Sequence, residues 1–260
     1  MLPFIHIGSF SVPSYGLCMA TGSIVACVLA YLRLKTRGGS FDSLLLVAAV
    51  ALAIGLCGAK LSYYCFSYGI SRLFSEIVRG DYSGFSDTGL VYYGGLIGGI
   101  LGAYLAIRVS KYNFDDYANS IVPCIPLGHA FGRIGCMLAG CCYGLHYNGT
   151  FAIHSAYVDP TETLFPIQAV EGLLNIVLFI FLILYTKKKR NGILTLSIYL
   201  ILYSMMRFVL EFFRGDLVRG IYLGFSTSQW ISAFLIFFAT IVIVLIQNGK
   251  LQISGKTSEQ

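Results

Sequence analysis

The residue of this chain best suited to chemistry is an arginine set inside apolar sequence. Arg133 lies in the run HAFGRIGCMLAGCCYG, residues 129–144. An arginine near the centre of a bilayer costs roughly 2.5 to 3.5 kcal/mol, so it needs an anionic partner or a water-filled cavity. Its planar guanidinium group also binds phosphate oxygens in pairs. Arg133 is therefore predicted to belong to an anion site.

A second group of charged residues lies in the segment MMRFVLEFFRGD. Arg207, Glu211 and Arg214 are spaced i, i+4 and i+7, so a helix would place them on one face. A structural salt bridge is the simplest interpretation, but two arginines and one carboxylate leave positive charge in or near lipid. A phosphate would supply the missing anion. Together with Arg133, the group predicts a cationic cavity that binds substrate.

Glycines recur at helical spacing in the segment YYGGLIGGILGA, residues 92–103. Gly94 and Gly98 are four residues apart, as are Gly95 and Gly99. Such spacing lets membrane helices approach closely. Tight packing is one interpretation. Glycines also leave room for a lipid headgroup, so Gly94 and Gly95 are candidate substrate-binding residues.

The composition indicates that a membrane protein positions these residues. Hydrophobic residues make up 57% of the chain and charged residues 12%, against roughly 25% charged in soluble domains. The 260 residues can form several spans of about 20 residues. No hydrophilic segment is long enough for a second domain, so we predict a single integral membrane domain over residues 1–260.

Seven apolar runs predict an all-α, polytopic fold with about seven transmembrane helices. In lipid, an open-ended segment must satisfy its backbone hydrogen bonds within itself, which a helix does. The runs cover residues 13–32, 43–65, 90–108, 118–140, 166–186, 192–212 and 228–247. Two longer connections, residues 66–89 and 143–165, are expected to form a small external cap.

The placement of lysine and arginine predicts the orientation. Eleven of them lie in one alternate set of connections and the C-terminal tail, and four lie in the other set. The richer side is normally cytoplasmic, so we expect the N-terminus outside and the C-terminus inside. The net charge of +6 does not indicate nucleic-acid binding, because the basic residues occupy short connections without interleaved aromatic residues.

Three of the eight cysteines, Cys136, Cys141 and Cys142, are clustered just after Arg133. With His129 and His146 nearby they permit a zinc site, but the spacing lacks the short ligand pairs of structural zinc. Packing, a disulfide and a modified active-site wall are the other interpretations. We predict no bound metal and no cofactor.

The chain resembles the prolipoprotein diacylglyceryl transferase family over almost its whole length. The resemblance runs in order through VPSYGL (12–17), GAKLSYY (58–64), YYGGLIGG (92–99), PLGHAFGRIG (126–135), FPIQAVE (165–171), RFVLEFFR (207–214) and STSQW (226–230). An ordered series of this length is specific. It implies seven spans with an external N-terminus, which agrees with the charge distribution.

The resemblance also implies an activity. Enzymes of this family, in the bacterial cell membrane, move diacylglyceryl from phosphatidylglycerol to the lipobox cysteine of a lipoprotein precursor and release glycerol phosphate. Arg133 and Arg207 would then contact the phospholipid headgroup. The residues implied to line or brace the cavity are Tyr15, Gln168, Glu211, Arg214 and Gln229.

The chain departs from the family pattern near the expected chemistry. After GRIG, Cys136 and Cys141 stand where the family usually has asparagine and glutamate, and Tyr93 replaces the histidine often found before GGL. A tyrosine, with its pKa of about 10, is a poor base at neutral pH. Tyr93, Tyr15 and Tyr143 are all candidates for a catalytic role beside the incoming thiol.

Two alternatives stay open. One is a divergent membrane enzyme that uses the Cys/His cluster on another lipid or an isoprenoid. The other is a transporter for an anionic solute, although the sequence shows neither an inward route nor internal symmetry.

Overall fold

The structure, a computed structural model, describes residues 2–7, 10–69, 75, 78–79, 92–155, 157–159, 161–215 and 221–249. Most of the predicted outer connection at 66–89, including Arg72, Glu76, Asp81 and Asp87, lies outside these residues. The same holds for the C-terminal tail from Lys250.

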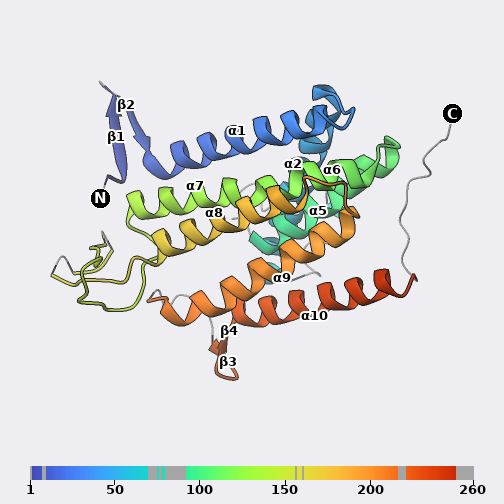
Figure 1. Cartoon of the computed structure of the whole chain (residues 1–260). Helices are drawn as coiled ribbons and strands as arrows, with labels where there is room; N and C mark the ends of the chain where they lie inside the picture. The colour runs from blue at the N-terminus through green and yellow to red at the C-terminus, as the bar shows by residue number, and fades with distance from the viewer. Residues whose placement is uncertain are drawn as a thin grey trace. The chain divides into compact units, whose positions relative to one another are not determined.

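The described chain is almost entirely helical (Figure 1). Its helices are α1 (Ser14–Lys35), α2 (Phe41–Tyr68), α5 (Tyr92–Val109), α6 (Phe114–Ile121), α7 (Ile125–Ala139), α8 (Ile167–Tyr185), α9 (Gly192–Leu210) and α10 (Thr227–Gln247), with 3₁₀ turns η1 (Val122–Cys124) and η2 (Glu211–Phe213). Two short antiparallel hairpins pair β1 (Phe4–Ile7) with β2 (Phe10–Pro13), and β3 (Ile221–Tyr222) with β4 (Phe225–Ser226).

The prediction of an all-α, polytopic membrane protein is confirmed. Six helical runs are long and apolar enough to cross a membrane, and one of them joins α6, η1 and α7 into a single run, Phe114–Ala139. The predicted third span is also helical, but its apolar part, Gly94–Val109, is shorter than the other six. All seven predicted ranges therefore contain a helix.

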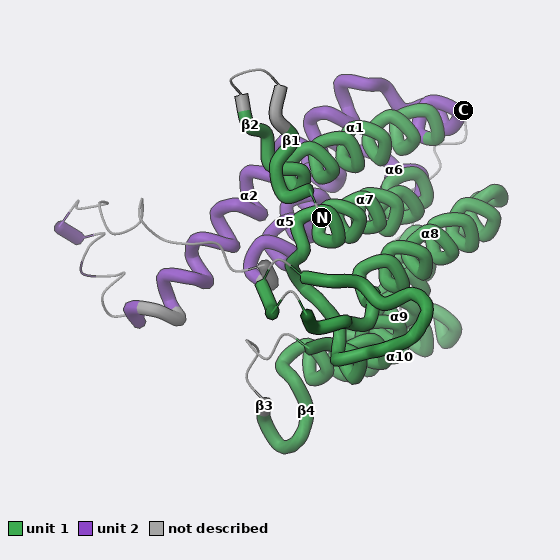
Figure 2. Tube along the Cα trace, turned by 90° about the vertical axis from the view of Figure 1, so that its left-hand side faces the viewer, with its two compact units in different colours: residues 1–33, 118–260 green, residues 34–117 purple. Residues whose placement is uncertain are grey.

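The chain forms two compact units (Figure 2), which are described separately. Unit 1 comprises Met1–Arg33 and Ala118–Gln260, and unit 2 comprises Leu34–Tyr117. The sequence predicted a single domain over residues 1–260.

Unit 2 is built on a close contact between α2 and α5. A Cβ atom added at Gly98 would lie 2.6 Å from the backbone oxygen of Ile54. One added at Gly94 would collide with the backbone oxygen of Gly58 and the hydroxyl of Ser62. The glycine run thus packs one helix backbone against another, which is the first of its two predicted roles.

Unit 1 is an assembly of antiparallel helices in which α7 packs against α8, and α9 against α10 (Figure 1). The run that contains α7 and the helix α8 are the most buried of the six candidate spans. Glycines also bring α7 close to α1: a Cβ atom at Gly135 would lie 3.2 Å from Cα of Tyr15. The most enclosed helices are therefore those that carry Arg133 and Gln168.

Hydrogen bonds join the basic ends of α1 and α8 in unit 1. Arg33 Nη2 donates to Thr186 Oγ1 at 2.6 Å and to the backbone oxygen of Asn119 at 3.0 Å. The side-chain amide of Asn119 donates to the backbone oxygen of Arg190 at 2.6 Å. Two of the connections rich in lysine and arginine thus lie at the same end of the unit.

Candidate functional site

The opposite end of unit 1 gathers most of the predicted site residues. Because neighbouring helices are antiparallel, the ends of α7 and α9 lie beside the starts of α1, α8 and α10 (Figure 1). The predicted residues on these segments are Tyr15, Arg133, Gln168, Arg207, Glu211, Arg214 and Gln229.

Arg133 on α7 forms an ion pair with Glu171 on α8. Its Nη2 lies 2.8 Å from Glu171 Oε1, and the glutamate side chain has no exposed surface. His129 Nε2 lies 4.0 Å from the same oxygen. Within the described structure, Glu171 Oε2 and Arg133 Nε have no hydrogen-bond partner. The pair neutralises a buried charge and leaves a donor of the guanidinium group unused.

Glu171 is a site residue that the sequence reasoning missed. The signal was present, since Arg133 needed an anionic partner and Glu171 is the one acidic residue in the apolar run 166–186. Of the motif FPIQAVE, residues 165–171, the sequence analysis assigned only Gln168 to the site. Contacts between helices leave no local spacing pattern, so the pair becomes visible only when α7 and α8 are placed side by side.

Arg207 and Glu211 form the second ion pair. Arg207 Nη2 lies 2.7 Å from Glu211 Oε2, and both side chains are largely buried. The same nitrogen lies 3.5 Å from Ser228 Oγ at the start of α10. The i, i+4 relation predicted from the sequence is confirmed for this pair.

Arg214 does not continue the helical face predicted for it. The α-helix ends at Leu210, a 3₁₀ turn follows, and Arg214 has extended backbone with φ −86° and ψ 137°. It forms an isolated antiparallel bridge with Gly144, and the N–H of Gly215 donates to the oxygen of Tyr143 at 3.1 Å. The segment that follows α7 therefore holds Arg214, which remains buried.

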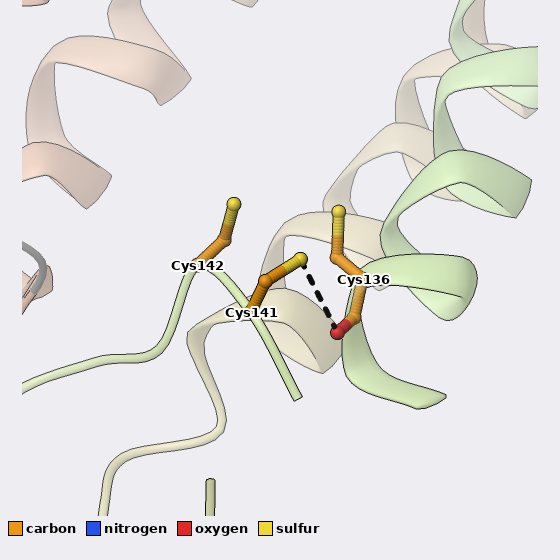
Figure 3. A group of neighbouring side chains, drawn as sticks. All are labelled: Cys136, Cys141 and Cys142. Carbon is orange, nitrogen blue, oxygen red and sulfur yellow. Dashed lines mark hydrogen bonds between the residues drawn. The ribbon is translucent and has the colours of Figure 1, made fainter. Parts of the chain in front are cut away.

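Three thiols gather beside this segment (Figure 3). The sulfur atoms of Cys136, Cys141 and Cys142 all lie within 4.8 Å of one another, and all three thiols are free. The pKa of Cys142 is lowered from its ordinary value, because Cys136 and the Arg214 guanidinium group donate hydrogen bonds to its sulfur. Because all three thiols are free, the structure shows no disulfide among them, which was one of the predicted interpretations.

The histidines considered with the cysteines lie elsewhere. His146 Nδ1 is 2.8 Å from the backbone oxygen of Thr163. His129 is the neighbour of Glu171, at 4.0 Å. In the part of the chain that is described, neither joins the thiol group. The predicted Cys/His cluster is thus a cluster of cysteines alone.

Gln168 and Gln229 have structural partners. Gln168 is buried, and its Nε2 donates to the backbone oxygen of Cys141 at 2.7 Å. This hydrogen bond fixes the segment that contains Cys141 and Cys142 against α8. Gln229 accepts a hydrogen bond from the N–H of Ser226 at 2.9 Å and so caps the start of α10.

The remaining candidates differ in how far the structure places them. Tyr15 lies in the first turn of α1 beside Gly135 and is 43% exposed. Tyr93 lies in α5, but its side chain is outside the described atoms. Gly94 and Gly95 lie in the α2–α5 contact of unit 2. The structure thus places Tyr15 near the arginine-bearing end of α7.

An apolar groove lies next to the charged site. It is formed by the end of α7, the segment 147–166 and the start of α8, with Met137, Phe165, Val170 and Leu173 in its wall. No arginine lines it. This groove is therefore not the cationic cavity that the sequence predicts, which stays a prediction.

Three guanidinium groups and two carboxylates meet at one end of unit 1: Arg133, Arg207 and Arg214, with Glu171 and Glu211. Apolar helices that place buried arginines and glutamates at one end of a bundle define the class of a polytopic membrane protein with a buried charged site.

Comparison with known proteins specifies this class further. The family described as "Prolipoprotein diacylglyceryl transferase" matches residues 3–245. The chain therefore belongs to the prolipoprotein diacylglyceryl transferase family, whose members are transferases that act on lipoprotein precursors.

Relatives cover nearly all of the chain. It is 32% identical to phosphatidylglycerol–prolipoprotein diacylglyceryl transferase 2 of Clostridium perfringens, over 98% of both chains. It is 34% identical to the phosphatidylglycerol–prolipoprotein diacylglyceryl transferase of Clostridium tetani, over 85% of this chain and 88% of that protein. A Dehalococcoides mccartyi protein of the same name is 30% identical, over 96% of this chain and 95% of its own length.

The pair between Arg133 and Glu171 generates a stability prediction. Glu171→Gln should lower the free energy of unfolding by about 3 kcal/mol, because removing one charge of a buried pair leaves the other uncompensated. The measurement is thermal unfolding of the detergent-purified protein. Glu162→Gln, on an exposed loop residue, is the matched control and should unfold like the wild type.

A double variant separates the ion pair from general packing. Arg133→Met combined with Glu171→Gln removes both charges, so it should be more stable than Glu171→Gln alone. If the two substitutions instead add their losses, the carboxylate does not serve as the counter-ion of Arg133.

Proposed function

We propose that this protein transfers diacylglyceryl from phosphatidylglycerol to the lipobox cysteine of a lipoprotein precursor. Membership of the family and the printed names of its relatives support this substrate pair. The observation that carries the proposal is the charge at one end of unit 1, where three arginines face two glutamates. A phosphodiester is an anion that guanidinium donors in this arrangement suit.

The geometry suits a phosphate more than a small structural anion. Arg133 uses Nη2 for Glu171, and its Nε has no partner within the described structure. A phosphate oxygen can accept from that unused donor. Arg207 is held rigidly by Glu211, so its guanidinium group is preorganised. Preorganised donors lower the energy of the charge that develops in the transition state.

The reaction forms one bond and breaks one. The precursor's thiolate attacks the diacylglyceryl carbon that bears the phosphate, a sulfur–carbon bond forms, and the carbon–oxygen bond breaks. Glycerol phosphate leaves with the electron pair. Arg133 and Arg207 would stabilise the leaving phosphate, and the apolar groove that contains Met137 and Leu173 offers a surface for an acyl chain.

The proposal assigns further residues around the phosphate. Tyr15, next to Gly135, is proposed beside the incoming thiol, and Tyr93 of unit 2 stays a prediction from the sequence. Arg214 and Glu211 complete the charged site, whereas Gln168 and Gln229 brace its walls through the hydrogen bonds described above.

Complementation tests the function. In bacterial cells depleted of their own diacylglyceryl transferase, expression of this chain should restore diacylglyceryl on a lipoprotein's N-terminal cysteine, read as added mass on its N-terminal peptide. Arg207→Ala provides the inactive control. Good expression without added diacylglyceryl, while an established family member succeeds in parallel, would reject the assignment in favour of a divergent lipid-modifying enzyme.

The role of Arg133 yields a quantitative prediction. Arg133→Lys should reduce turnover by about 10²-fold, the typical cost of losing one preorganised donor, because lysine keeps the charge but lacks the bidentate fork. The assay measures transfer from phosphatidylglycerol vesicles to a lipobox peptide at equal membrane abundance. Arg33→Lys, at the opposite end of α1, is the matched control. Near-wild-type turnover in Arg133→Lys would remove the arginine from phosphate binding.

We also propose that the N-terminus and the arginine site face outward, with the C-terminus in the cytoplasm. The basic residues at the ends of α1 and α8 lie together, as expected for one cytoplasmic face. A reporter fused after Gln260 should read as cytoplasmic and one inserted after Asp159 as external. Both reporters on the same side would contradict this topology.

A further inference from the structure

The three-cysteine group consists of Cys136, Cys141 and Cys142, and the backbone is shaped to assemble it. Cys136 lies in the last turn of α7, which ends at Gly140 in the left-handed conformation with φ +79°. Cys142 is also left-handed, with φ +58°. For a residue with a side chain this costs roughly 1 to 2 kcal/mol. The chain accepts that strain where it brings three sulfur atoms within 4.8 Å of one another (Figure 3).

We propose that the three thiolates bind one Zn²⁺ ion and that its fourth position takes the thiol of the lipoprotein precursor. The proposal rests on the proposed function, because it identifies what activates the nucleophile of that reaction.

The sulfur positions fit a zinc site after small side-chain rotations. Tetrahedral zinc with Zn–S bonds of about 2.3 Å holds its sulfur ligands about 3.8 Å apart. The present separations, at most 4.8 Å, therefore need to shorten by about 1 Å at most. The Cys141 backbone oxygen accepts a 2.7 Å hydrogen bond from Gln168, so the backbone is already fixed.

The number of protein ligands indicates a catalytic zinc site rather than a structural one. Structural zinc sites have four protein ligands, whereas catalytic sites have three and an open position. Among the described residues, no histidine or carboxylate joins the three cysteines. A thiol that enters the fourth position gives up its proton to water and is bound as thiolate. This is the nucleophile the transfer requires, and it needs no tyrosine as a base.

The cluster is located where the attack must occur. Cys136 follows Arg133 by three residues, so both project from the same side of α7. Cys142 lies two residues before Gly144, whose antiparallel bridge holds the backbone of Arg214 beside the cluster. The zinc-bound sulfur would therefore stand beside the guanidinium groups proposed to bind the leaving phosphate.

The step is balanced without an oxidant or reductant. The electron pair of the zinc-bound sulfur forms the sulfur–carbon bond, and the carbon–oxygen bond to phosphate breaks. Glycerol phosphate carries away the electron pair. The thioether product is a weak ligand, so water replaces it on the zinc ion, which the three protein thiolates retain.

Metal content of the full chain, purified in detergent under reducing conditions, is the first measurement. Elemental mass spectrometry should find about one zinc per chain in the wild type and nearly none in the triple variant Cys136→Ser/Cys141→Ser/Cys142→Ser. Cys57→Ser, at an exposed cysteine of α2, is the matched control and should keep its zinc. Equal zinc in all three proteins, or a disulfide within the cluster, would overturn the proposal.

A second measurement uses only the wild-type protein and so does not depend on the variant's folding. Cobalt-loaded protein should show sulfur-to-cobalt charge-transfer absorption, which should increase when a lipobox peptide adds a fourth thiolate. The same peptide with serine in place of cysteine should cause no change. Equal spectra with both peptides would show that the open position does not take the substrate thiol.

Activity separates this proposal from the function on which it rests. Chelation of zinc should reduce transfer about 10²-fold, the lower end for loss of a positioned group that deprotonates a nucleophile, and added Zn²⁺ but not Mg²⁺ should restore it. Full transfer by the chelated protein would reject the zinc proposal and leave the proposed transferase function standing. Binding of zinc and of the peptide thiol without transfer from phosphatidylglycerol would reject the proposed transferase function and leave the zinc site standing.

Discussion

The buried charge of Arg133 is the constraint on which the rest of the site depends. A guanidinium group in an apolar bundle requires a counter-ion, and Glu171 supplies it from the neighbouring helix at 2.8 Å. That pairing holds Arg133 of α7 and Glu171 of α8 at the same depth in the bundle. These two helices are also among the most buried segments, so the charge is surrounded by helix packing. In the second pair, Glu211 neutralises Arg207 from the same chain segment, four residues further along.

Much of the fold follows from the sequence, because lipid imposes one rule on every span. Apolar runs of sufficient length must be helical, and all seven predicted ranges contain a helix. The pair between Arg207 and Glu211 was also predictable, since helical spacing is local. What spacing could not predict are contacts across helices, as with Glu171, and irregular backbone, as with Arg214, where the helix ends before the last residue of the pattern.

The cysteine cluster is a second case in which residue spacing does not predict which side chains meet. Cys136 is separated from Cys141 and Cys142 by five and six residues, a spacing that places them on different sides of a continuous helix. Only the two left-handed residues after α7 turn the chain back so that the sulfur atoms meet. Small residues act similarly in the packing of helices: Gly135 allows α1 to approach α7, and Gly98 allows α5 to approach α2. In both cases a backbone property decides which side chains become neighbours.

The complete burial of Glu171 has a consequence for ligand discrimination. A carboxylate fixed beside Arg133 is a tethered competitor, present at an effective concentration far above that of a free ion in solution. A simple anion such as chloride, which offers a single contact, cannot outcompete it. A ligand that reaches several donors together, as proposed for a phosphodiester, would compete with the glutamate more strongly than a single-contact anion. In the proposed site, the glutamate would thus raise the affinity that any anion needs in order to bind at Arg133.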